Sequence, residues 1–256
     1  MCGDDVTVES FARALEPFDR ILLEHGDRDS DDLHEFLAGL GYVVEGFREK
    51  DMVRGQFDVT ARDLIVGGVP TVRAALRRLG RDMPEPNDYP SQLTPFLRRR
   101  IWSSTIAGAQ ASLERGDGPV FIKPQGRLKR FTGRVASDTS GWPLAGVSRH
   151  QPVWCSEVVD WLCEHRVFVV RGEILDIRPY FGDTSVSPNN DVVGRSLEAL
   201  SGTAPAAFAL DVGVLSDHST AIVEMNDGFA VGRYGLSPHL YVELLAARWH
   251  ELVTTG

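Results

Sequence analysis

Cysteine is scarce in this 256-residue sequence: Cys2, Cys155 and Cys163 are the only ones, and their spacing matches no metal-binding motif. An odd number of cysteines without such spacing argues against a disulfide framework and favours the reducing cytoplasm. The sequence also lacks an apolar run of about 18 residues, so we expect no membrane span. Its N-terminus lacks a basic segment followed by an apolar core, so we expect no signal peptide.

Positive charge is also in short supply, since 27 Lys and Arg face 36 Asp and Glu, for a net charge of -9. We therefore expect neither a nucleic-acid partner nor an anionic-membrane surface. The segment 125–134 is a local exception that carries Arg127, Lys129, Arg130 and Arg134. Such a basic loop suits either a small polyanion, such as a triphosphate, or a simple solvated turn.

Acids inside apolar strands are the most informative feature of the sequence. Residues 208–215 and 221–225 are apolar runs separated by the polar turn 216–219, which predicts a β-hairpin. Asp211 lies in the first run, whereas Glu224 and Asn226 lie two residues apart in or just after the second and share a face. Buried carboxylates need compensation, and three converging oxygen ligands suit Mg²⁺. The alternative is an edge strand whose acids face water.

The rest of the chain alternates between helix and strand signals. Residues 1–92 predict a small α/β layer, whose last part, from residue 81, holds three prolines and forms a linker. Thr94 and Pro95 predict the start of a helix that runs to Glu114. We expect further strands at 119–123 and 153–159, a strand hairpin at 166–178 and a C-terminal helix at 237–252.

Charged side chains on the predicted strands form a second group of candidates. Lys123 ends an apolar strand, where an ammonium needs an anionic partner such as phosphate. Glu157 lies in the run 153–159, and Glu164 follows seven residues later. Arg166 and Arg178 belong to the next hairpin, and an arginine fork matches phosphate oxygens. Taken singly, each of these residues is more often part of a surface ion pair.

In combination, these features resemble the ATP-grasp superfamily. The motif FIKP (121–124) is similar to its lysine strand, and EHRVFVVRGEILDIRPY (164–180) is similar to its arginine-bearing strand pair. The separation of Asp211, Glu224 and Asn226 resembles the metal spacing of D-alanine–D-alanine ligases. KRFTG, SEVVDW and VEMNDGFAVGRYG further resemble a clade of small ATP-grasp proteins named for two arginines and one lysine.

The resemblance implies an α+β fold, with two α+β subdomains that clasp ATP in residues 93–256. A small α/β pre-ATP-grasp segment in residues 1–92 would precede them. The nucleotide-binding residues that the resemblance implies are Lys123 and Lys129 for the phosphates, Glu157 with the backbone of Val158 and Val159 for adenine, Glu164 for ribose, and Arg166.

The same resemblance implies a metal site and two catalytic residues. Asp211, Glu224 and Asn226 would hold one or two Mg²⁺ ions, and Arg178 would reach the γ-phosphate or an acyl phosphate, with Lys129 closing over the phosphates. Three departures from the superfamily qualify this assignment, the first being that a basic, glycine-poor loop replaces the usual glycine-rich lid. The ligases carry an arginine where this chain has Ala209, and their upstream nucleotide lysine has no clear match, Arg99 and Arg100 being the nearest candidates.

The implied activity is an ATP-dependent ligation of a carboxylate to an amine, on an amino acid, a peptide or another small molecule, through an acyl phosphate. Two other classes remain open from the sequence. The same fold hosts kinases, which transfer phosphate without ligation, and a non-catalytic nucleotide-binding module is the third alternative.

Overall fold

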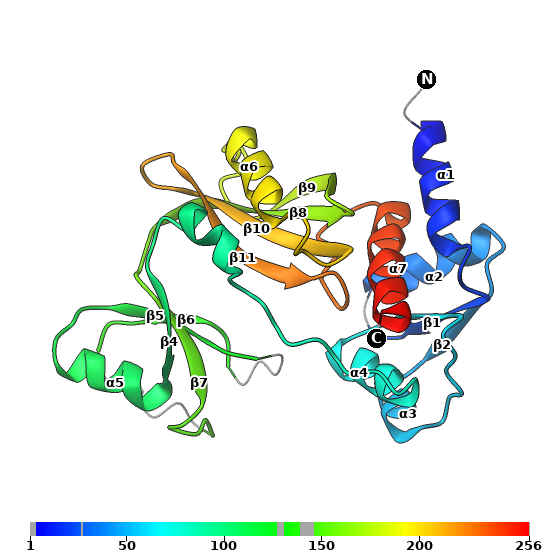
Figure 1. Ribbon diagram of the computed structural model, residues 1–256, viewed down its shortest axis with the longest axis horizontal. Coiled ribbons are helices and arrows are strands. Elements are labelled where there is room, and N and C mark those ends of the chain that lie inside the picture. The colour runs from blue at the N-terminus through cyan, green and yellow to red at the C-terminus, as the bar shows by residue number, and fades with distance from the viewer. Residues whose placement is uncertain (1–3, 27, 127–130, 139–145, 256) are drawn as a thin grey trace.

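The computed structural model describes residues 4–26, 28–126, 131–138 and 146–255, which form three sheets (Figure 1). The first sheet is parallel, in the order β2-β1-β3, with β1 at Arg20–Glu24, β2 at Val44–Phe47 and β3 at Asp63–Val66. Its helices are α1 (Asp4–Leu15), α2 (Arg28–Gly39), α3 (Glu49–Arg54) and α4 (Val69–Arg78). The expectation of a small N-terminal α/β layer is confirmed.

The second sheet is antiparallel, in the order β4-β7-β5-β6, and it corrects the expected helix at 95–114. Only a short 3₁₀ helix, η1 (Ser91–Phe96), follows the Thr94–Pro95 signal; β4 (Ile101–Thr105) comes next, and helix α5 spans Ile106–Glu114. β4 forms because each of its five residues pairs with β7 (Pro152–Ser156), a partner about fifty residues away. Thr105 then caps α5, since its Oγ1 accepts the Gly108 N–H at 3.1 Å.

The expected strand at 153–159 is three residues too long at its C-terminal end. β5 (Val120–Pro124) and β4 both reach their last pairing with β7 at Ser156, so the ladder stops there on both sides. Beyond it, Glu157 folds back on Arg100: its N–H bonds the Arg100 carbonyl at 3.1 Å, and its carboxylate accepts the Arg100 N–H at 2.9 Å. Residues 157–160 therefore connect two sheets rather than continue a strand. β6 (Arg134–Ala136) completes the second sheet.

The third sheet is also antiparallel, in the order β11-β10-β8-β9. Its strands are β8 (Trp161–Val170), β9 (Glu173–Gly182), β10 (Ala207–Leu215) and β11 (Thr220–Asp227). The predicted hairpin of 208–225 is therefore confirmed as β10 and β11. One face packs on α6 (Asn190–Leu200) and η1 through apolar side chains that include Val167, Leu210 and Ile222. The other face is covered at one end by the C-terminal helix and carries polar side chains beyond it.

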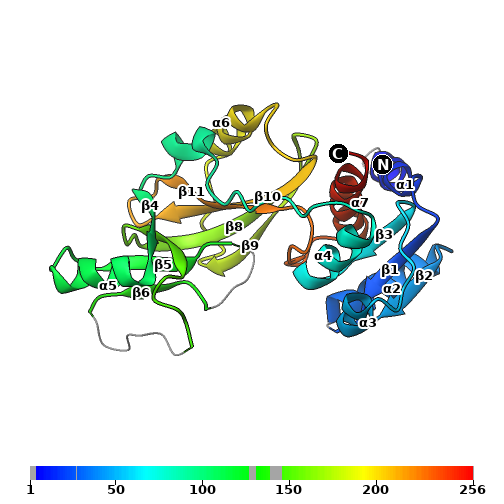
Figure 2. The ribbon, with the colours of Figure 1, turned by 60° about the horizontal axis from the view of Figure 1, so that its bottom comes forward.

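That C-terminal helix, α7 (Pro238–Thr254), is buried on nearly every side. Val242, Leu245 and Trp249 pack into the core of the N-terminal layer, and Leu244 and Ala247 pack on the third sheet. The Trp249 indole N–H also donates to the Asp63 carbonyl of β3 at 2.6 Å. Figures 1 and 2 both show α7 between the parallel sheet and β8–β11, so the last helix joins the first layer to the rest of the fold.

No helix within the described residues combines the length and the apolarity that a membrane crossing requires.

Candidate active site

A row of charged side chains crosses the third sheet, one from each strand. Arg178 on β9 lies opposite Arg166 on β8, Arg166 lies opposite Asp211 on β10, and Asp211 lies opposite Glu224 on β11. Directly opposed residues of an antiparallel sheet point to the same face. Residues two positions along a strand share that face as well, which adds Glu164, Tyr180 and Asn226 to the row.

Arg166 and Asp211 form a buried ion pair at the centre of this row. The guanidinium Nε and Nη2 donate to the two carboxylate oxygens, both at 2.7 Å, and the residues are only 7% and 2% exposed. The rings of Tyr234 and Tyr180 lie 4.6 and 5.7 Å from the guanidinium carbon and cover it. Burial raises the pKa of Asp211 to about 6 although Arg166 opposes the shift, so its carboxylate is ionised at neutral pH.

Asn226 and Glu224 extend the row toward the second sheet. The Asn226 amide donates to Asp211 Oδ2 at 3.0 Å and to Glu224 Oε1 at 3.3 Å, so the three predicted metal ligands lie together. Lys123 arrives from β5 of the other sheet, and its ammonium bonds the Glu224 carboxylate. Lys123 and Glu224, which lie 101 residues apart in the sequence, are therefore in contact.

Lys123 has a second acidic partner that the sequence did not suggest. Its Nζ lies 2.8 Å from Asp88 Oδ2, and it also lies 4.6 Å from the centre of the Tyr89 ring. Burial alone would lower the pKa of Lys123, but Glu224 and Asp88 outweigh it and hold that pKa above its usual range. Lys123 is thus a permanent cation in the ligand-free protein, neutralised by two acids.

Glu164, the predicted ribose ligand, faces the same side of the sheet. Its Oε2 accepts the Tyr180 hydroxyl at 2.6 Å. Burial raises the pKa of Glu164, and the nearby charge of Glu224 adds to the shift. Burial likewise raises the pKa of Tyr180, so this phenol remains protonated and can donate.

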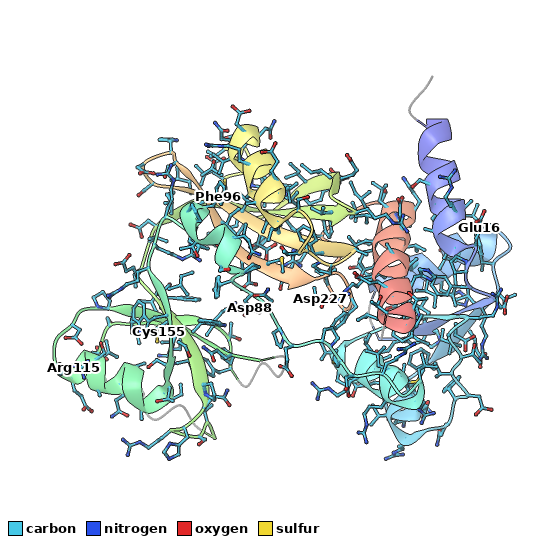
Figure 3. The ribbon with its side chains drawn as sticks, viewed as in Figure 1. Glu16, Asp88, Phe96, Arg115, Cys155 and Asp227 are labelled. Carbon is cyan, nitrogen blue, oxygen red and sulfur yellow. The ribbon has the colours of Figure 1, made fainter. Side chains whose placement is uncertain are left out.

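A cavity of about 790 Å³ opens in front of these residues, a size typical of ligand sites. Its lining includes Phe121 and Lys123 from β5, Glu164 and Tyr180 from the third sheet, and Glu224 and Asn226 from β11. Asp88 from the linker and Gln92 from η1 close another side. Asp211 lies behind them, with 3% of its side chain exposed. Figure 3 shows Asp88 on the linker that passes β11.

Arg178, the predicted catalytic arginine, has partners for only some of its hydrogen-bond donors among the described residues. One of its terminal nitrogens lies 2.6 Å from Asp176. Its Nε is buried and, among the residues that the structure describes, has no hydrogen-bond partner. A buried donor left in that state costs free energy until an acceptor binds it, and a phosphate oxygen is a suitable acceptor.

The adenine candidates lie on the connection between the second and third sheets. Val158 and Val159 follow β7, and Glu157 turns toward Arg100 with about half of its side chain exposed. Of the two arginines considered for the upstream nucleotide position, Arg99 instead donates to the carbonyls of Ile222 and Val223, both at 2.8 Å. Lys129 lies outside the described residues.

The donor set suits Mg²⁺ that arrives with a nucleotide. Among the described residues, no three His, Cys, Asp or Glu side chains form a metal cluster. Mg²⁺ bound with a triphosphate needs only one or two carboxylates, and Glu224 and Asp211 supply two beside the Asn226 amide. The residues near this face carry five acids (Asp88, Glu164, Asp176, Asp211, Glu224) and four cations (Lys123, Arg99, Arg166, Arg178), because Arg99 also interacts electrostatically with Glu164 and Glu224. Bound Mg²⁺ would add positive charge where the acids outnumber the cations.

Two site residues were missed from the sequence for different reasons. Tyr180 had a signal, because it lies two residues after Arg178 and must share its face. Asp88 had none, because an acid in a proline-rich linker carries no periodic pattern.

Comparison with known proteins gives a family and a fold. Residues 96–244 match the model of an ATP-grasp domain, that of family 2 in the clade named for two arginines and one lysine. No curated protein matches the chain. Among solved structures, D-cycloserine synthetase DcsG is 14% identical with a TM-score of 0.56, covering 90% of this chain and 99% of its own.

Two further structures align over similar lengths. The ATP-grasp ligase PsnB, complexed with a minimal precursor, is 12% identical with a TM-score of 0.53, over 90% of this chain and 99% of its own. The D-alanine–D-alanine ligase of Bacillus anthracis is 14% identical with a TM-score of 0.53, over 91% of this chain and 96% of its own. These likenesses confirm the predicted α+β ATP-grasp fold. Since the family match spans more than half of the chain, the protein belongs to family 2 of the ATP-grasp clade named for two arginines and one lysine.

Proposed function

We propose that this protein is an ATP-dependent carboxylate–amine ligase that works through an acyl phosphate. The observation that carries the proposal is the contact between Lys123 of the second sheet and Glu224 of the third, at the wall of a nucleotide-sized cavity. Solved structures with this fold include a macrocyclase bound with a precursor peptide and a D-alanine–D-alanine ligase. An amino acid or peptide substrate is therefore the class we propose.

The nucleotide would lie between the two antiparallel sheets. Lys123 would bind the α- and β-phosphates with help from Lys129, and Arg166 would add charge behind them. Glu164 would hold the ribose in place of the Tyr180 hydroxyl that it now accepts. Glu157 and the backbone of Val158 and Val159 would hold adenine at the connection between the sheets.

Glu224, Asn226 and Asp211 would hold one or two Mg²⁺ ions against the phosphates, and Arg178 would donate its unpaired Nε to the γ-phosphate. The metal would supply neutralisation of the charge on the transferring phosphoryl group. This chain's share is to position the groups and exclude water, so no side-chain nucleophile is required.

The reaction has two balanced steps. A carboxylate oxygen of the first substrate attacks the γ-phosphorus of ATP, the bond to the β-phosphate oxygen breaks, and ADP leaves. The amine nitrogen of the second substrate then attacks the acyl carbon, phosphate leaves, and the amine loses one proton. The products are an amide, ADP and phosphate.

The decisive experiment is a screen for ADP release across amino acids and short peptides with ATP and Mg²⁺, followed by mass spectrometry of the product. Hydroxylamine in parallel reactions should trap the acyl phosphate as a hydroxamate. ADP release that requires a hydroxyl acceptor and yields no hydroxamate would instead indicate a kinase. Nucleotide binding without turnover under any acceptor would indicate a non-catalytic module.

Glu224→Gln tests the metal assignment within that screen. The substitution keeps the shape of the side chain but removes the charge that we propose to hold Mg²⁺, so turnover should fall by about a hundredfold or more. Glu198→Gln, an exposed acid on α6, should leave turnover unchanged. Normal Mg²⁺-dependent turnover by Glu224→Gln would refute the assignment.

A further inference from the structure

Asp88 connects the linker to the phosphate-binding lysine. Its side chain lies 2.8 Å from Lys123 Nζ, and its backbone carbonyl accepts the Met225 N–H of β11 at 2.9 Å. The backbone contact fixes the linker against the free edge of the third sheet, one residue from Glu224. Asp88 is thus held where its carboxylate meets the Lys123 ammonium.

The surroundings of Lys123 leave its ammonium little freedom. Its side chain is 15% exposed, and those of Asp88 and Glu224 are each 24% exposed. The Tyr89 ring covers Lys123 at 4.6 Å and packs edge-on against Trp154, with ring centres 5.2 Å apart. An ammonium has three N–H donors, and here two carboxylates from different elements hold it in place.

These contacts have a consequence for any phosphate that binds Lys123. The incoming anion must take the ammonium from two carboxylates, and both carboxylates repel it. A divalent cation that binds together with the phosphates would contact Glu224, but it would leave the ion pair between Asp88 and Lys123 in place. A nucleotide without a metal is repelled by the full charges of both Asp88 and Glu224.

We propose that Asp88 is a positioning residue that holds Lys123 in the ligand-free protein and makes nucleotide binding depend on a divalent cation. The inference rests on the proposed nucleotide site and adds its regulation. Asp88 acts through Lys123 and not on the reacting atoms. The charge of Asp88 weakens binding of the nucleotide without its metal more than binding of the Mg²⁺–nucleotide complex, because the metal-free nucleotide is the more negative ligand.

The size of the effect follows from the charge of the ligand. ADP carries a charge of about -3 as the free anion and about -1 as its Mg²⁺ complex. One nearby charge therefore changes the logarithm of the affinity about three times more for free ADP than for Mg²⁺–ADP. If removing the Asp88 charge strengthens binding of free ADP about tenfold, binding of Mg²⁺–ADP should gain only about twofold. The ratio of the two dissociation constants should then fall about fivefold.

The test is isothermal titration calorimetry of ADP with the intact protein, once with excess Mg²⁺ and once with EDTA, for wild type and Asp88→Asn. We expect tighter binding of free ADP by Asp88→Asn and a smaller ratio between the two conditions. Glu85→Gln removes one exposed charge from the same linker at the same cavity and should lower the ratio less than Asp88→Asn does. Asp88→Glu keeps the charge and should restore most of the metal dependence.

Three results would overturn the inference. Weaker binding of Mg²⁺–ADP by Asp88→Asn, with free ADP unchanged, would make Asp88 a metal ligand instead. An unchanged ratio would leave Asp88 without any influence on the metal dependence. Failure of the wild-type protein to bind ADP in either condition would refute the proposed nucleotide site itself, and is thereby distinguishable from the other two.

Discussion

The buried pair of Arg166 and Asp211 makes a quantitative prediction about stability. Arg166→Met removes the guanidinium but keeps an unbranched side chain against the Tyr180 and Tyr234 rings. Asp211 would then be a carboxyl group, 2% exposed, without the cation that opposes the rise of its pKa, so it would either stay charged without compensation or take up a proton. Removing one partner of such a pair costs about 3–5 kcal/mol, because the remaining group is buried without a counter-charge or must be neutralised.

The effect is large enough for simple measurements. Urea unfolding of the ligand-free protein at pH 7.5, followed by circular dichroism, should show a loss of about 3–5 kcal/mol for Arg166→Met. For a chain of this length the corresponding fall in Tm is roughly 6–20 °C. The double variant Arg166→Met/Asp211→Leu should recover most of the loss, because an apolar pair of similar volume leaves no buried charge.

Arg62 and Asp19 provide a control with the same chemistry and a different environment. They also form two hydrogen bonds, both at 2.6 Å, but their side chains are 60% and 63% exposed. Arg62→Met should therefore cost far less stability than Arg166→Met. The reasoning would be refuted if Arg166→Met and Arg62→Met cost the same, or if the double variant at 166 and 211 were no more stable than Arg166→Met.

Two further predictions concern titration and thiol chemistry. Glu164 has a raised pKa in the folded state, so its contribution to stability is present below its unfolded pKa and is lost as pH rises through the folded value. Glu164→Gln should therefore stabilise the ligand-free protein at pH 7 more than at pH 4; equal shifts in the urea midpoint at both pH values would contradict this. Burial raises the pKa of Cys155 to about 11, and it raises the pKa of Cys163 as well. Peptide mapping should find neither thiol alkylated by iodoacetamide at pH 8 in the native protein and both alkylated in urea, whereas native labelling of either one would argue against their burial.

The hairpin of β10 and β11 could be predicted because its signals are local. Two apolar runs and a four-residue polar turn predict the hairpin, but a β-bulge between Asp211 and Val212 shifts the register and places Asp211 opposite Glu224. The placement of Lys123 against Glu224 could be inferred only from the family resemblance, because the two residues lie on different sheets. The roles assigned to the site residues, and the division of the chain after residue 92, stay predictions.

The errors arose where distant pairing overrode local signals. Ile101–Thr105 follows a helix-start signal, yet it becomes a strand because β7 offers a complete row of partners. Glu157 leaves the strand because both neighbours of β7 end at Ser156. Asp88 meets Lys123 only because the linker crosses the edge of β11, and no short segment of sequence encodes that crossing.

The helix α7 determines the order in which this chain can complete its fold during synthesis. The N-terminal layer emerges from the ribosome before the two antiparallel sheets, but Val242, Leu245 and Trp249 of its core belong to the last helix. The nascent layer must therefore wait, with that apolar surface uncovered, until α7 has been synthesised. Any transplant of this layer onto another protein would have to bring the final helix with it.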